Sequence, residues 1–151
     1  MLLQGLELVQ YPRERRSPPG SRWGPWESLR SSGPAWEAVV EAIEQLDRDE
    51  FPLLYLHLAE PEEWEQPMHA MQVCGGLGEY SVCLWLPSAL LEYRDASRGA
   101  EDVEIWRSDQ GASLPACELC NDLAVVIRIA RHFADTGAPL ETVSWESRDR
   151  V

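Results

Sequence analysis

The sequence predicts an α+β fold: a mostly antiparallel sheet with two main helices packed on one face. Two segments, one beginning at Pro34 and one after Pro115, carry apolar residues at helical spacing. Around and between them lie short strand-like runs, two of which are joined by a connection of hairpin length. Helices separated by hairpin-connected strands are typical of this fold class. The length of 151 residues fits one domain, 1–151.

A strand and a long loop are predicted at the N-terminal end. Residues 2–11 alternate loosely and stop before Pro12, which predicts an edge strand because proline cannot donate to a ladder. Residues 12–33 are rich in Pro, Gly, Ser and Arg and predict a loop. We expect Trp23 and Trp26 of this loop to dock onto the body of the protein; the alternative is an exposed binding surface.

The first predicted helix begins at Pro34, because proline is tolerated in the first turn. Its apolar stripe consists of Trp36, Val39, Val40, Ile43 and Leu46. Its other side carries Glu37, Glu41 and Glu44. This spacing predicts an amphipathic helix with an acidic outer side. The apolar run that follows, at 51–59, has the length of a buried strand and is expected at the centre of the sheet.

A β-hairpin is predicted from residues 68–74 and 79–86, which are strand-like runs joined by the glycine-rich residues 75–78 (GGLG). A glycine cluster can also form a phosphate loop, but no Lys-Ser or Lys-Thr follows and no helix starts there. Residues 88–93 predict a short extended segment and residues 101–107 a further strand. The expected sheet therefore contains the N-terminal strand, the 51–59 strand, the hairpin and the 101–107 strand.

The second predicted helix has Asn121 as its N-cap and ends at Gly137. Its apolar residues at helical spacing are Leu123, Val126, Ile127, Ala130 and Phe133. The sequence ETVSWES at 141–147 has strand character, and a charged tail is expected from Arg148 onward.

The chain is strongly acidic, and its charge narrows the possible partners. All thirteen basic side chains are arginines, and they face twenty-six carboxylates, which gives a formal net charge of −13. This sign repels nucleic acid and anionic membranes and favours basic partners. The absence of lysine excludes Schiff-base catalysis and a Walker-type phosphate site.

The negative charge is concentrated in residues 37–65, which hold ten acidic residues and only one arginine. One interpretation is a solubilising surface; the other is a face that binds a basic protein, because a tryptophan surrounded by carboxylates is typical of an interface anchor. Under the second interpretation the partner-binding residues are Glu37, Glu41, Glu44, Glu62, Glu63, Trp64 and Glu65.

Neither an enzyme nor a metal site is expected from the sequence. Its three histidines, His57, His69 and His132, lie in no recognisable catalytic or metal motif, and no Gly-x-Ser-x-Gly elbow occurs. The gap between Cys117 and Cys120 suits a zinc ligand pair, but Cys74 and Cys83 form no second close pair. We therefore expect structural thiols, no catalytic residue, no metal and no cofactor; a hydrolase that uses Cys or Glu chemistry is the alternative.

We expect a cytoplasmic protein. No apolar run approaches the ~18–20 residues that cross a bilayer. The first residues carry Glu7 where a secretory segment would have a basic start and a longer apolar stretch.

Residues 34–147 resemble bacterial polymorphic-toxin immunity proteins, in particular the class found beside deaminase-type toxins. The motifs that carry the resemblance are WE at 36–37, MQV at 71–73, GGLGEY at 75–80, EIW at 104–106, HF at 132–133 and WE at 145–146. The resemblance implies a small, non-enzymatic, cytoplasmic protein that neutralises a cognate toxin by blocking its active site or substrate groove. The acidic charge of the chain predicts in addition that this toxin has a basic surface. The alternative is an adaptor or chaperone-like module for a secreted effector, which would bind through Trp23 and Trp26.

Overall fold

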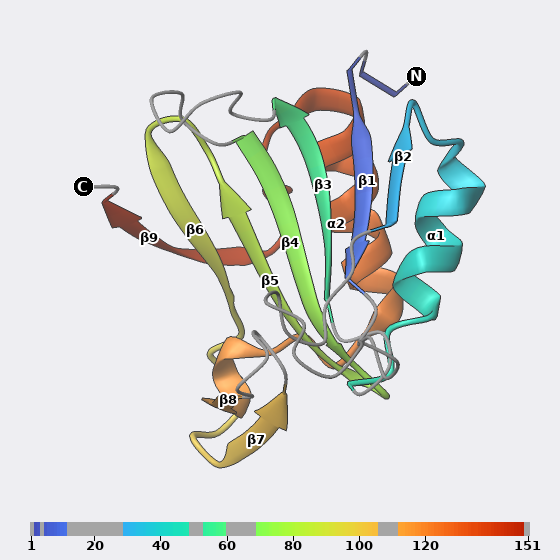
Figure 1. The fold of residues 1–151 in the computed structure, drawn as a ribbon. Helices are drawn as coiled ribbons and strands as arrows, with labels where there is room; N and C mark the ends of the chain where they lie inside the picture. The colour runs from blue at the N-terminus through green and yellow to red at the C-terminus, as the bar shows by residue number, and fades with distance from the viewer. Residues whose placement is uncertain are drawn as a thin grey trace, which may run out of the picture.

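The computed structural model describes residues 2–3, 5–11, 29–48, 53–59, 69–105 and 112–149. In this part of the chain, a seven-stranded antiparallel sheet is packed against two α-helices (Figure 1). A separate two-stranded ribbon and a short 3-10 helix lie at one end of the sheet. The predicted α+β class, with a mostly antiparallel sheet and two helices on one face, is confirmed.

The large sheet has the order β2-β1-β3-β4-β5-β6-β9. Its strands are β1 (Glu7–Tyr11), β2 (Leu29–Ser32), β3 (Leu53–Ala59), β4 (His69–Gly76), β5 (Glu79–Trp85), β6 (Ala89–Arg94) and β9 (Ser144–Asp149). The ribbon pairs β7 (Asp102–Ile105) with β8 (Ala112–Pro115). The helices are α1 (Trp36–Glu44), the 3-10 helix η1 (Ala116–Glu118) and α2 (Leu123–Thr136).

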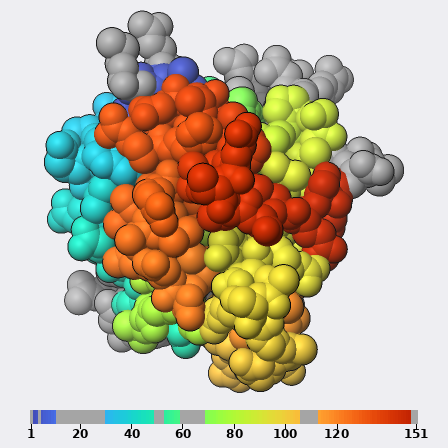
Figure 2. All heavy atoms as spheres, turned by 180° about the vertical axis from the view of Figure 1, so that it is seen from behind, coloured from blue at the N-terminus to red at the C-terminus, as the bar shows by residue number. Residues whose placement is uncertain are grey.

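Alternation along the strands places the main core on one face of the large sheet. One row of cross-strand partners that faces the helices is Leu8, Leu56, Met71, Leu84 and Leu91. Val39 and Ile43 of α1 and Ile129 and Phe133 of α2 pack against this face and are fully buried. Figure 2 shows α2, in orange, covering the middle of the face, with α1, in cyan, beside it. Burial of these side chains supplies the main stabilising contribution to the fold.

Both helices start slightly later than the sequence predicts. Asp122, not Asn121, is the N-cap of α2, and its carboxylate accepts a hydrogen bond from the Ala124 amide at 3.0 Å. Gly137 ends α2 with a left-handed φ of 73°, as predicted. The N-cap of α1 is Ala35, so Pro34 precedes the helix instead of forming its first turn.

The hairpin between β4 and β5 is confirmed, but its turn is shorter than predicted. Gly76 pairs with Glu79, which leaves Leu77 and Gly78 as a two-residue turn, both with positive φ. Gly75 and Gly76 belong to β4, and Gly76 allows the backbone after α1 to approach the strand closely. A Cβ on Gly76 would lie 2.3 Å from the Leu46 carbonyl oxygen, so only glycine permits this approach.

The segment that follows α1 is fastened to this hairpin. The Arg48 amide donates to the Gly75 carbonyl at 2.9 Å, and its guanidinium Nε donates to the Gly76 carbonyl at 2.6 Å. Asp47 forms an isolated β-bridge with Gly76. The C-terminal end of α1 is thereby fixed to the glycine pair of β4.

Three strand predictions are wrong. The N-terminal strand is not an edge strand, because β2, from the end of the predicted 12–33 loop, pairs with β1 on its outer side. Residues 102–105 are not part of the large sheet; they pair with β8, while β6 and β9 extend the large sheet instead. Arg148 does not begin a tail, because β9 continues to Asp149. Residues 12–28 of the predicted loop, with Trp23 and Trp26, lie outside the described residues.

Candidate protein-binding site

The outer side of α1 is acidic, as the spacing of its glutamates predicts. Glu37, Glu41 and Glu44 are all exposed. None of the three makes an ion pair with another described residue. We call these three residues the α1 acidic face. Three negative charges on a single helix side, without ion pairs to described residues, form a surface that attracts a basic partner.

A groove of about 310 Å³ runs beside the α1 acidic face, between α1 and the edge of the sheet formed by β1 and β2. It is lined by Leu8, Gln10, Ser31, Ala38, Glu41, Ala42 and Gln45. Figure 1 shows α1 alongside these two strands. Glu41 alone of the three glutamates lines the groove. At the groove, Gln10 of β1 donates from Nε2 to Oε1 of Gln45 at 3.0 Å, so a hydrogen bond joins the sheet to the end of α1.

Contacts with α2 fix the orientation of α1. The guanidinium of Arg131 lies over the ring of Trp36, with its central carbon 5.1 Å from the ring centroid. Its Nε also donates to Asp135 at 3.0 Å within α2. Together with the buried Val39 and Ile43, these contacts keep the apolar stripe inward. The three glutamates are therefore held on the outside.

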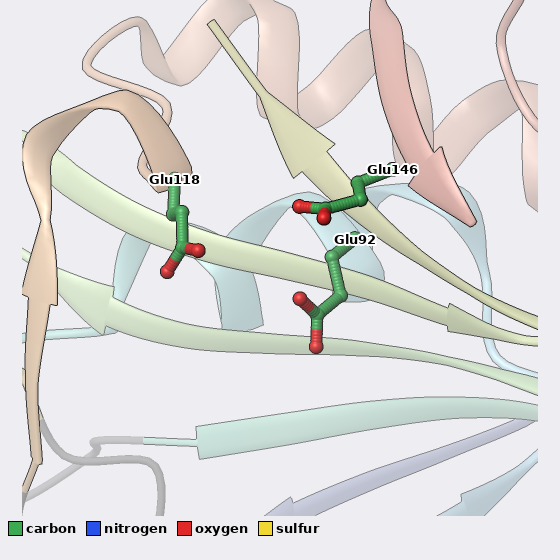
Figure 3. Close-up of side chains that lie close together, drawn as sticks. All are labelled: Glu92, Glu118 and Glu146. Carbon is green, nitrogen blue, oxygen red and sulfur yellow. The ribbon is translucent and has the colours of Figure 1, made fainter. Parts of the chain in front are cut away.

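A second acidic cluster lies across the sheet, where Glu92 of β6, Glu146 of β9 and Glu118 of η1 converge (Figure 3). One oxygen from each carboxylate lies within 4.8 Å of the others. Carboxylate oxygens are ligands for Mg²⁺ and Ca²⁺, but arginines already face these three. Arg94 bonds Glu146 and lies 4.0 Å from Glu118, and Arg148 lies 3.3 Å from Glu92.

This cluster is an ion-pair network that joins two strands and η1. The hydrogen bond from Arg94 lowers the pKa of Glu146 below its usual value, and the same bond raises the pKa of Arg94. A nearby bidentate pair has the same character. Arg98 bonds both carboxylate oxygens of Glu79, at 2.6 and 2.7 Å, and also the Leu119 carbonyl at 3.0 Å. Each acid in this region is therefore within ion-pair distance of an arginine of the chain itself.

The surroundings of the four cysteines suit a structural role in packing. Cys74, Cys83 and Cys120 are buried, Cys117 is half-buried, and none of the four is in a disulfide. Burial raises the pKa of the Cys120 thiol, which opposes formation of the nucleophilic thiolate. In the described part of the chain, Cys117 and Cys120 share no group of three metal-ligating side chains. The arrangement gives no support to the zinc alternative.

The described histidines in the sheet also pack as structural residues. His57 is 7% exposed and stacks on Tyr55, with ring centroids 5.3 Å apart. His69 Nε2 lies 2.8 Å from the Gly137 carbonyl oxygen, and its ring meets the edge of Phe133. His57 is on the same face of the sheet as Cys83, but β4 separates their strands. No Cys-His pair of the kind that a hydrolase requires is therefore formed by these residues.

Only part of the predicted binding surface falls within the described residues. Glu37, Glu41 and Glu44 lie together on α1, whereas Glu62, Glu63, Trp64 and Glu65 lie outside the described residues. The groove itself was missed by sequence reasoning, because Ser31 belongs to a strand that the composition predicts as loop. Gln10 and Gln45, which line the groove and are joined by a hydrogen bond, belong to no sequence motif that would mark them as neighbours.

No protein-family model matches the chain, and no curated protein matches it. The resemblance to immunity proteins therefore stays a prediction. No helix among the described residues is long and apolar enough to cross a membrane.

Proposed function

We propose that this protein is a cytoplasmic, non-enzymatic immunity protein that binds and neutralises a cognate bacterial toxin. The toxin in this proposal is a nucleic-acid-targeting enzyme of the deaminase type, and the protein acts by occluding its active site or substrate groove. The α1 acidic face carries the proposal: three exposed carboxylates, without ion pairs to other described residues, beside an open groove.

The chemistry of the toxin explains why such a surface suits it. An enzyme that acts on nucleic acid needs a positively charged groove to hold the phosphate backbone. A row of carboxylates on a rigid helix complements that groove and competes with the substrate for it. Complementary charge also accelerates encounter of the two proteins, which matters when a toxin must be captured before it acts. The formal net charge of −13 has the sign that this encounter needs.

The proposal is tested by co-expression with the toxin candidate encoded immediately upstream of this gene. Growth should be rescued by the protein, and the purified pair should form a complex whose association rate falls as salt is raised. A toxin that kills equally well with and without this protein would refute the proposal. An interface insensitive to salt would leave immunity in place but remove the α1 acidic face from it.

The adaptor or chaperone-like alternative relies on Trp23 and Trp26, which lie outside the described residues. A double substitution of both tryptophans by alanine distinguishes it. Loss of partner binding at unchanged stability would favour the adaptor, whereas immunity through the α1 acidic face predicts that binding persists.

A further inference from the structure

We infer that the groove between α1 and the β1–β2 edge is a receptor for one arginine side chain of the partner protein. The inference rests on the proposed function for the identity of the partner, and on the groove itself for the chemistry of the ligand. The cavity of about 310 Å³ is at the small end of ligand pockets, so a single long side chain suits it better than an extended ligand.

The walls of the groove match the stem of a long cationic side chain. Leu8 is buried in the floor, and Ala38 and Ala42 supply small apolar surfaces on the helix side. An aliphatic stem of three methylene groups can lie along such a surface while its charged head remains at the opening. The small volume of the two alanines leaves the space open. A larger residue at either position would fill it.

The polar groups of the groove match the head of that side chain. The Glu41 carboxylate has two acceptor oxygens and makes no ion pair with a described residue. Ser31 and Gln10 add oxygen acceptors from the strands. Guanidinium presents five donors in a planar fork, so it can bond several of these acceptors together, whereas ammonium acts as a compact point charge. Arginine is therefore preferred over lysine.

The charge of the surroundings excludes an anionic occupant. A phosphate or carboxylate in the groove would face Glu41 directly, with Glu37 one turn before it and Glu44 one turn after it on the same helix side. Each of these charges repels an anion and attracts a cation.

Only Glu41 of the three α1 glutamates lines the groove, so its substitution should affect binding more than substitution of Glu37 or Glu44. If the three carboxylates acted only through long-range attraction, neutralising any one of them would have the same small effect, mainly on the association rate. If the groove binds an arginine, Glu41 makes a direct charge-assisted bond that the others do not make. Glu41→Gln should then weaken toxin binding by roughly 10-fold, mainly through faster dissociation, against about 2-fold for Glu37→Gln and Glu44→Gln.

A filling variant tests the space independently of the charge. Ala38→Leu should occupy the groove and weaken toxin binding by roughly 10-fold, since an arginine stem would lose its contacts. Ala124→Leu on the exposed start of α2 is the matched control and should bind as the wild type does. Thermal unfolding of each variant confirms that the fold is retained.

A small probe tests the groove without the toxin. N-acetyl-arginine amide, titrated into the isotope-labelled full chain, should shift the backbone amide signals of Ala38, Glu41 and Gln45. The uncharged isostere N-acetyl-citrulline amide should not, and Glu41→Gln should abolish the arginine response. The inference is overturned if arginine and citrulline shift these signals equally or not at all. It is also overturned if a bound toxin is weakened equally by all three glutamine substitutions.

The two hypotheses fail separately in this design. Groove signals that respond to arginine in a chain that does not bind the toxin would refute the immunity proposal and support the receptor. A chain that binds the toxin, keeps its affinity in the Ala38→Leu variant and shows no amide shift with the arginine probe would support immunity. The same result would refute the proposal that the groove receives an arginine.

Discussion

The two acidic regions of this protein differ in what faces their carboxylates. At the β6–β9 edge, Glu92, Glu118 and Glu146 each form an ion pair with Arg94 or Arg148, so two of their three negative charges are balanced. On α1, none of the three glutamates is paired with a described arginine. The same residue type therefore stabilises the fold in one region and is left available for a partner in the other. Sequence composition alone counts both regions equally.

The α1 acidic face is also unfavourable for its own helix. Glu37 and Glu41 are like charges four residues apart, which destabilises a helix by a few tenths of a kcal/mol. Glu44 lies at the C-terminal end, where the helix dipole favours a cation, and the last turn of α1 contains no basic residue. Local rules are most often broken at functional sites, so this arrangement supports a role outside the fold.

The largest expected effect is loss of partner binding on neutralising the α1 acidic face. The triple variant Glu37→Gln, Glu41→Gln, Glu44→Gln should weaken binding of the proposed toxin roughly 50-fold, about 2.3 kcal/mol, because both the proposed groove contact and the attraction are removed. Calorimetric titration measures the change. The triple variant Glu101→Gln, Glu104→Gln, Glu141→Gln changes the net charge equally at exposed positions elsewhere and should bind almost normally. Equal losses in the two variants would remove the distinction between the regions.

The next effect is on stability, in the region where the acids are paired. Arg98→Gln removes the bidentate pair with Glu79 and the bond to the Leu119 carbonyl, in a site where both side chains are less than one-fifth exposed. The free energy of unfolding should fall by about 2 kcal/mol, while binding of the proposed toxin should be unchanged. Denaturant unfolding measures the loss. Arg128→Gln, at an exposed position of α2, should leave stability unaltered.

The Arg94–Glu146 pair should make stability dependent on pH in the acid range. The pKa of Glu146 is lowered in the folded state, so its contribution is complete above the ordinary value of 4.5 and is lost as pH falls through the lowered value. Arg94→Gln should lower Tm at pH 7 by a small amount, and the difference from wild type should shrink toward pH 2. A difference that grows on acidification would show that the pair does not act in this way.

The smallest effect should be a gain in stability on α1. Glu44→Gln removes a negative charge from the C-terminal turn and should raise the free energy of unfolding by ~0.3 kcal/mol, because the unfavourable dipole interaction is relieved. Glu37→Gln provides the comparison and should show no gain, because relief of the repulsion from Glu41 is offset by loss of a favourable negative charge at the N-terminal turn. Parallel chemical denaturation of both variants resolves the sign.

The fold class and the α1 acidic face could be predicted from the sequence because both follow from the regular spacing of apolar and polar residues. Val39 and Ile43 recur at helical spacing and are buried, while the glutamates between them are exposed. The strand β2 could not be predicted. Its sequence, LRSS, has no apolar alternation, and it is held by backbone pairing with β1, such as Glu7 opposite Ser32.

The wrong assignment of β7 to the large sheet has a similar cause. Its strand character was visible, but the partner of a strand depends on which edges are free in three dimensions. The edge beyond β6 is taken by β9, from the C-terminal end of the chain. The groove could not be predicted from the sequence either, because its wall includes Ser31 of the unpredicted strand β2. A site built across two elements cannot be recognised when one of them is missing from the predicted fold.

The fastening of Arg48 to the glycine pair of β4 gives this protein an internal reporter of binding. Exchange of the Arg48 amide hydrogen with solvent requires the end of α1 to detach from the Gly75 carbonyl. A partner that binds α1 opposes this detachment, so the Arg48 amide hydrogen should exchange more slowly in the complex than in the free protein. Arg48, which does not line the groove, would then report through the exchange rate of its own amide that a partner is bound to the helix.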